Sequence, residues 1–402
     1  KFNDKYLLGA SFTREGYSQF RPDNRWGNFY SLSAGWIISD DFFKESDVVS
    51  LLKLRASYGE TGNGNIPGGI TNSQFNLNTS RKLYAEQPSL NVSGIGNGAA
   101  TWEKLNNLDV GLDYALFNNK LSGSLAYYRQ DILSLLLQIT LPASAGIGNN
   151  RGDPGNNSIW GNVGDMVNDG IEFDISGLAI DKADFSWRVG FNITTNNNEV
   201  TSISPDIDAS GEGIRETYTF TRKGLPLGTY FMADYAGVDP ARGIPMIREV
   251  NLEEAANGVY MYTGNIIPAT ENNARIHKAP IGRKSALPTY FGGFNNTITY
   301  KNIDFGFNIY FQGGNYIYNR HRMEAEFAQN GATARIADIF ENSWRQPGDI
   351  AEYPQLTAGA RYDYDDEGNP GTAQIFVGNQ GYNTKFLEKG DFIRLRNVSL
   401  GY

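Results

Sequence analysis

The stretch SWRVGFNIT, residues 186–194, alternates polar and apolar side chains without a break. Trp187, Val189, Phe191 and Ile193 fall on one face, and Ser, Arg, Gly, Asn and Thr occupy the other. Because successive side chains of a β-strand point to opposite faces of a sheet, this period of two predicts a strand with one apolar face. If the pattern repeats along the chain, the fold class is all-β.

The same alternation does recur. It is strong at residues 107–116 and 304–311, and weaker near 2–13, 28–38, 51–59, 120–131, 168–178, 289–300 and 391–402. We therefore expect about ten strands. The composition agrees, because 13% of the 402 residues are aromatic and 46 are glycine, a mixture that suits strands and turns better than helices.

The connections between these strands alternate between long and short. Along the chain they run near 14–27, 39–50, 60–102, 117–119, 132–167, 179–184, 200–288, 301–303 and 312–390. Antiparallel strands that run between a side of tight turns and a side of large loops produce this rhythm, which is typical of an outer-membrane barrel. A soluble sandwich has no reason to sort loop length by side. The gap 39–50 is the imperfect case and has room for a short helix.

Aromatic residues bracket two of the apolar faces. Tyr290 and Tyr300 lie about 33 Å apart along an extended strand, or about 25 Å in height when the strand is tilted by about 40°. Trp102 and Tyr114 bracket another face in the same way. These heights match the apolar band of an outer-membrane barrel, so we expect all four residues to form membrane girdles. The alternative is that aromatic residues favour strand ends in any β protein.

Charge and composition exclude several classes of function. Lys and Arg number 35 against 44 Asp and Glu, a net charge of −9, so the basic footprint of a nucleic-acid-binding protein is missing. The absence of cysteine excludes disulfides, thiolate zinc sites and cysteine nucleophiles. No run of about 18 apolar residues predicts a transmembrane helix. A mean hydropathy of −0.42 is nevertheless compatible with membrane-spanning strands, which alternate.

Six stretches resemble a single family, in that family's order. They are RWGNFYSLSAGW (25–36), LKLRASYGETGN (52–63), WEKLNNLDVGLDYALFNNKLSGSLAYY (102–128), FSWRVGFNITTNNNEV (185–200), YFGGFNNTITYKNIDF (290–305) and FLEKGDFIRLRNVSLGY (386–402). The family is the SusC/RagA group of TonB-linked outer-membrane transporters. The resemblance implies a barrel of about 22 strands whose lumen holds an N-terminal plug. We find neither the plug nor the last strands, so we expect residues 1–402 to be an arc of such a barrel.

The resemblance also implies a function and its partners. We expect TonB-dependent import of a nutrient, an oligosaccharide in the first instance, across the outer membrane of a Gram-negative bacterium. The implied partners are a SusD-like surface lipoprotein, TonB acting through the plug, an oligosaccharide or peptide ligand, and outer-membrane lipid. The alternatives are a passive outer-membrane porin and a secreted β-sandwich carbohydrate-binding module. No nucleic acid and no enzymatic activity are expected.

Aromatic side chains in the expected long loops are candidates for ligand contacts. Sugar recognition uses aromatic faces beside planar polar groups, and Trp160, Tyr218, Tyr260 and Tyr262 lie among many Asn and Asp residues. Each is equally suited to pack loops against one another or against a partner protein. The resemblance does not fix which of them bind.

Acidic residues in the loops suggest two further sites, neither of which we favour. Asp363 and Asp365 begin a run that resembles a calcium loop, but its twelfth position is Gln374 rather than glutamate, so a solvated turn is the preferred interpretation. Asp165 and Asp169 could form the carboxylate pair of a glycosidase, yet such pairs arise by coincidence among so many acidic residues. We expect no cofactor, with calcium as the alternative.

Overall fold

The computed structural model describes residues 1–64, 69–78, 89–140, 158–205, 207–208, 211–216, 218–326, 336–356, 362–364, 370–374 and 383–402. The chain forms two compact units. The sheet unit comprises Lys1–Ile207, Thr289–Gln312 and Ile393–Tyr402. The loop unit comprises Asp208–Pro288 and Gly313–Phe392.

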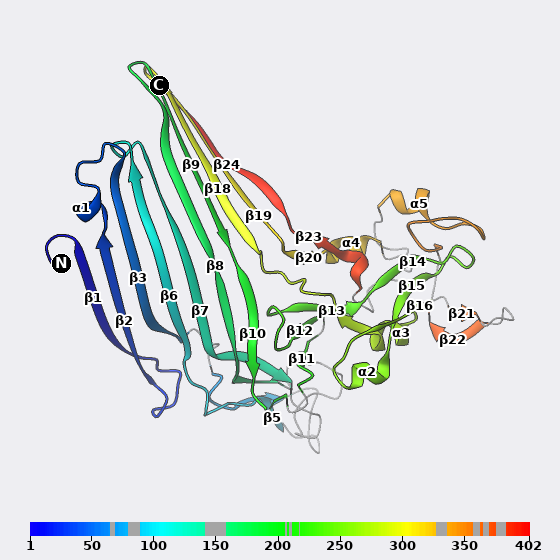
Figure 1. Ribbon diagram of the computed structural model, residues 1–402. Helices are drawn as coiled ribbons and strands as arrows, with labels where there is room; N and C mark the ends of the chain where they lie inside the picture. The colour runs from blue at the N-terminus through cyan, green and yellow to red at the C-terminus, as the bar shows by residue number, and fades with distance from the viewer. Residues whose placement is uncertain are drawn as a thin grey trace. The chain divides into compact units, whose positions relative to one another are not determined.

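The sheet unit is built on one sheet of 11 strands (Figure 1). The strand order is β1-β2-β3-β6-β7-β8-β9-β18-β19-β24, and β10 pairs with β8. Their bounds are β1 (Tyr6–Gly16), β2 (Trp26–Ile37), β3 (Val49–Asn63), β6 (Glu103–Leu116), β7 (Leu121–Thr140), β8 (Ser158–Lys182), β9 (Phe185–Thr195), β10 (Asn197–Ile203), β18 (Tyr290–Tyr300), β19 (Ile303–Gly313) and β24 (Phe392–Gly401). Every strand predicted from alternation is present, so the all-β antiparallel fold is confirmed.

The connections follow the predicted rhythm. Tight turns occupy 117–120, 183–184 and 301–302, and the segment before β3 carries the short helix α1 (Ser39–Phe42). The alternate connections are longer and include a hairpin of β4 (Gln74–Asn78) and β5 (Ser89–Gly94). Helix α1 is therefore the short helix for which the gap 39–50 has room.

The register of the sheet aligns apolar side chains on one face. Leu54 lies opposite Trp36 and Leu112, and Leu112 lies opposite Leu125. Many of these side chains are exposed, with Leu125 at 49% and Ile171 at 50%. A contiguous exposed apolar face of this width requires a cover, and lipid covers such a face in a membrane barrel.

Strands β7 and β8 are longer than predicted. Alternation predicts a loop over 132–167, whereas β7 continues to Thr140 and β8 begins at Ser158. A bulge explains the difference, because the pairing shifts after Ile132 and Ser134 has a left-handed backbone with φ of 59°. The extra residue interrupts the period of two, so the sequence pattern ends before the strand does.

The loop unit contains short strands and helices in place of the long loops predicted near 200–288 and 312–390. The four-stranded sheet is β11 (Ile214–Arg215), β12 (Thr219–Thr221), β13 (Thr229–Ala233) and β17 (Lys278–Pro280). The three-stranded sheet is β14 (Tyr235–Val238), β15 (Pro245–Val250) and β16 (Tyr262–Pro268). Two further pairs are β20 (Tyr316–Tyr318) with β23 (Leu387–Lys389) and β21 (Tyr362–Tyr364) with β22 (Pro370–Gln374).

Short helices complete the loop unit. They are α2 (Leu252–Ala256), α3 (Glu271–Ile276), α4 (Arg320–Ala325), α5 (Asp338–Asn342) and the 3-10 turn η3 (Thr384–Phe386). Side-chain oxygens of Asn251, Thr270 and Asn319 cap the first turns of α2, α3 and α4. No helix in the described part of the chain is long and apolar enough to span a bilayer. The buried residues Ala233, Ile247, Ala269 and Ala274 give the unit a core of its own.

Candidate functional site

The polar face of the sheet unit carries a group of ion pairs. Lys53 Nζ lies 3.1 Å from Asp113 Oδ2, and Arg55 Nε lies 3.1 Å from Asp113 Oδ1. The Arg55 guanidinium also pairs with Asp109. Because β3 and β6 are paired in register, their odd-numbered residues share one face and meet there.

A row of carboxamides crosses the same face. Asn107, Gln130, Asn168 and Asn198 lie directly opposite one another on β6, β7, β8 and β10. Gln130 Nε2 donates to Asn107 Oδ1 at 2.9 Å, Asn168 Nδ2 donates to Gln130 Oε1 at 3.4 Å, and Asn198 Nδ2 donates to Asn168 Oδ1 at 2.6 Å. Asn107 Nδ2 donates to Thr61 Oγ1 at 3.4 Å. We call these five residues the amide ladder.

Two carboxylates stabilise the bulge in β7. The backbone N–H of Ser134 donates to Asp165 at 2.9 Å, and that of Leu136 donates to Glu103 at 2.7 Å. Glu103 also accepts from Asn63 at 2.6 Å, and Asp165 accepts from Ser202 at 2.7 Å. These carboxylates satisfy backbone groups that the irregular pairing leaves without a ladder partner.

An aromatic cluster lies beyond the amide ladder in the sheet unit. The ring centroid of Trp102 lies 5.5 Å from those of Phe20 and Phe29 and 6.2 Å from that of Tyr17. Its indole N–H donates to the carbonyl of Arg25 at 3.3 Å. Trp102 is 7% exposed, so the cluster is a buried core that joins the connection before β2 to the start of β6.

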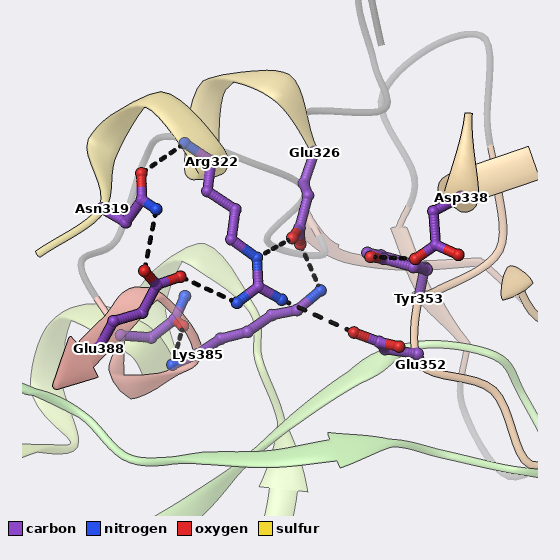
Figure 2. Close-up of polar contacts among 9 residues, drawn as sticks. Asn319, Arg322, Glu326, Asp338, Glu352, Tyr353, Lys385 and Glu388 are labelled. Atoms are coloured by element: carbon purple, nitrogen blue, oxygen red, sulfur yellow. Dashed lines mark hydrogen bonds and ion pairs between the residues drawn. The ribbon is translucent and has the colours of Figure 1, made fainter. Parts of the chain in front are cut away.

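The loop unit contains a group of charged side chains around one buried ion pair (Figure 2). The Arg322 guanidinium lies 2.6 Å from Glu326 and 3.1 Å from Glu388, and its third neighbour, Glu352, lies at 3.6 Å. Lys385 Nζ lies 2.6 Å from the other oxygen of Glu326. The side chains of Lys385 and Glu326 are only 12% and 3% exposed. This group links α4, η3 and β23.

Burial and hydrogen bonding shift the pKa values of this group in opposite directions. Burial lowers the pKa of Lys385, although Glu326 partly offsets this by favouring the charged ammonium. Burial would also lower the pKa of Arg322, but hydrogen bonds to Glu388 and Glu326 raise it overall. Hydrogen bonds from Asn319 and Arg322 hold the pKa of Glu388 below its usual value. The raised pKa of Arg322 and the lowered pKa of Glu388 keep these two groups charged near neutral pH.

A small, mainly apolar cavity of about 50 Å³ adjoins these charges. Its walls include Ile247, Met323, Phe386 and Tyr235. The Tyr235 hydroxyl is buried and has no hydrogen-bond partner among the described residues. Burial and then the carboxylate of Glu326 raise the pKa of Tyr235, so it remains a neutral donor.

Comparison with known proteins assigns the fold. The family described as TonB dependent receptor-like, beta-barrel, matches residues 1–274. The chain belongs to this receptor-barrel family. The resemblance to SusC/RagA transporters is confirmed as well, since one curated relative is named SusC and a structure of RagAB shares the fold.

The relatives of this receptor barrel are considerably longer than the chain. TonB-dependent receptor P39 of Formosa agariphila is 29% identical over 100% of this chain and 38% of its own length. TonB-dependent receptor SusC of Bacteroides thetaiotaomicron is 26% identical over 99% of this chain and 36% of its own length. A structure of the RagAB peptide transporter superposes with a TM-score of 0.77 at 24% identity. The match covers 99% of this chain and 39% of the transporter chain. The chain thus spans less than two fifths of each.

Within the receptor barrel, the predicted girdle residues separate into two groups. Tyr290 and Tyr300 lie at the two ends of β18 and are 38% and 52% exposed. Tyr114 lies on the apolar face of β6, next to Gly123, and its hydroxyl donates to the carbonyl of Asp174 at 3.3 Å. Trp102 is the exception, because it precedes β6 and turns into the buried aromatic cluster. Its assignment to an exposed girdle is wrong; for the other three residues the girdle stays a prediction.

The predicted ligand-contacting aromatics of the receptor barrel are divided between the two units. Trp160 lies in β8 and packs against the aromatic cluster of the sheet unit. Tyr218, Tyr260 and Tyr262 lie in the loop unit. Tyr218 stacks on Tyr318 with centroids 6.1 Å apart.

Tyr260 and Tyr262 have polar partners in the loop unit. The Tyr260 hydroxyl accepts from Arg215 at 2.8 Å, and its ring meets Phe231 edge-on at 5.5 Å. Burial and the Asp234 carboxylate raise the pKa of Tyr262 to about 12. These partners show packing roles for both rings, and ligand contact by any of the four aromatics stays a prediction.

The structure describes three of the four acidic candidates. Asp363 lies in β21, and Asp365 lies outside the described residues. No cluster of three or more potential metal ligands occurs among the residues that the structure describes. Asp165 binds the bulge of β7, whereas Asp169 accepts from Asn197 at 3.1 Å. Calcium binding stays a prediction.

Sequence reasoning missed the amide ladder and the group around Arg322. The alternation over residues 107–116 predicts a polar face that includes Asn107, but it does not say which residues of neighbouring strands lie opposite that residue. The spacing of Glu326, Lys385 and Glu388 along the chain gives no signal that they meet. Only the strand register and the fold of the loop unit bring these residues together.

Proposed function

We propose that this chain is the barrel portion of an outer-membrane importer that takes up a nutrient, an oligosaccharide, in Gram-negative bacteria. One observation carries the proposal: a single sheet of a receptor-barrel family has one exposed apolar face and one face lined by ion pairs and amides. Lipid would cover the apolar face, and the polar face would line a hydrated or plugged lumen.

Energy coupling and partners are proposed from the resemblance to SusC and RagA. A plug domain would occupy the lumen, and force exerted by TonB on that plug would open the path. A SusD-like surface lipoprotein would cover the outside. The loop unit supports such a partner, because Val259, Met261 and Ile266 expose apolar side chains at 45%, 52% and 51%.

Import is a binding and gating function, and we propose no covalent chemistry for any residue. The secreted β-sandwich is inconsistent with the receptor-barrel family. A passive porin differs from an importer because its uptake does not depend on TonB, and the experiment below distinguishes the two by that dependence. One of the similar structures is named a peptide transporter, which makes peptide the competing cargo.

Expression of the full-length protein with an affinity tag tests the proposal. We expect recovery in detergent-solubilised outer membrane together with a surface lipoprotein, and ligand uptake that is lost when TonB is deleted. Uptake that continues without TonB would indicate a porin. Recovery as a soluble secreted protein would overturn the membrane function altogether.

A further inference from the structure

The amide ladder is an uncharged row of hydrogen-bonding side chains on the polar face. Its members are all neutral, and four of them are carboxamides on adjacent strands. A carboxamide has two N–H donors and two acceptor lone pairs. In Gln130 and Asn168 the ladder uses one donor and one lone pair, which leaves one of each for another partner.

The surroundings restrict what that partner can be. On one side of the ladder the same face carries Ile132 and Val200, which are 6% and 1% exposed. On the other side lies the pair Arg55 and Asp109, whose charges already neutralise each other. A ligand on the ladder would thus meet neutral hydrogen-bonding groups, and the charges further along β8 on this face are the exposed carboxylates Glu172 and Asp174.

We propose that the amide ladder is a contact site for a neutral, hydroxyl-rich oligosaccharide on its way through the barrel. Sugar hydroxyls both donate and accept, as the free carboxamide edges do, so one hydroxyl can satisfy two adjacent amides. Mutually bonded amides also polarise one another, which strengthens the bonds at their free edges. The proposal rests on the proposed function, because it assigns the sugar a place within that importer.

A peptide is the less suitable ligand. Its termini and many of its side chains are charged, and burying a charge without a partner is costly. The exposed carboxylates further along β8 on this face, Glu172 and Asp174, would also repel anionic groups. Peptide binding is therefore kept as an outcome of the test.

The test uses the full-length receptor purified from outer membrane together with its partner. The probes are maltoheptaose, cellohexaose, mannohexaose and a tryptic digest of casein. The variants are Gln130→Met alone and Gln130→Met with Asn168→Leu, which keep the side-chain volume and remove the amides. The control is Asn295→Leu, an exposed position on the polar face of β18, away from the ladder.

We expect the wild-type protein to bind at least one of the neutral oligosaccharides. The double variant should lose about tenfold in affinity for it, the single variant less, and the control nothing. Equal affinity of the wild type and the double variant would overturn the ladder proposal and leave the importer intact. Binding of casein peptides alone would overturn the proposal together with the oligosaccharide cargo. If the double variant fails to show the heat-dependent mobility shift of a folded barrel, the single variant decides.

Discussion

Glu324 and Glu326 lie two residues apart at the end of α4, yet their carboxylates are in opposite environments. Glu324 pairs with Arg320 at the surface, with side chains 48% and 68% exposed. Glu326 is 3% exposed and shared between Arg322 and Lys385. Exposed pairs contribute little because water and salt screen them, whereas loss of one partner of a buried pair leaves an unpaired charge.

The substitution Glu326→Gln should therefore weaken the loop unit much more than Glu324→Gln. We expect a decrease of about 3 kcal/mol in the local unfolding free energy for Glu326→Gln, because Lys385 loses its counter-charge. For Glu324→Gln we expect a decrease of less than about 0.5 kcal/mol. Hydrogen exchange of the α4 amides in the full-length protein measures both. Equal effects would show that the buried pair is not structurally important.

Acid should destabilise the same group through Glu388. Hydrogen bonds from Asn319 and Arg322 lower its folded-state pKa, so the unfolded state binds the proton more tightly. Its stabilising contribution is complete above the ordinary glutamate pKa of about 4.3 and is lost as the pH falls through the lowered value. Exchange of the β23 amides, corrected for intrinsic rates, should show protection that is constant above about pH 5 and falls in acid. Glu388→Gln should remove that dependence; an unchanged acid response would contradict the assignment.

At the scale of elements, β7 shows how far the sequence predicts the structure and where it does not. Alternation near 120–131 predicts the first part of this strand, and the register then puts Leu125 on the apolar face and Ser124 on the polar face. It fails at Ser134, because a bulge needs a partner strand and two carboxylates from elsewhere, which no local pattern reveals. The amide ladder is hidden for a similar reason: its residue types are visible, but their alignment depends on register. The loop unit depends on contacts between distant segments, such as Arg322 with Glu388.

The two faces of β7 should differ in their tolerance of charge. Leu125→Arg would place a cation on the lipid-covered face, at a cost of about 2–4 kcal/mol near the bilayer midplane. Ser124→Arg should be tolerated, because Ser124 lies opposite Asp113 and Asp174 on the polar face. The fraction of full-length protein that reaches the outer membrane in the heat-modifiable folded form measures this. Equal yields from the two variants would contradict the face assignment.

At the scale of the whole molecule, every functional proposal requires the sheet to separate lipid on one face from the aqueous interior of the barrel on the other. The alternation of apolar and polar side chains, repeated in each strand, gives the sheet an apolar face suited to lipid and a polar face suited to water, plug and cargo. The family assignment, the predicted girdle tyrosines of β18, the ion pairs around Arg55 and the amide ladder are all interpreted through that separation. If the faces were not sorted in this way, none of the functional proposals would hold.

Accessibility along β7 tests this claim most directly. The chain contains no cysteine, so single cysteines can be placed at Ser124, Leu125, Ala126 and Tyr127 in the full-length receptor and labelled with a fluorophore. In membranes that contain brominated lipid, we predict strong quenching at positions 125 and 127 and weak quenching at 124 and 126. Uniform quenching, or its absence at all four positions, would contradict a sheet that divides lipid from lumen.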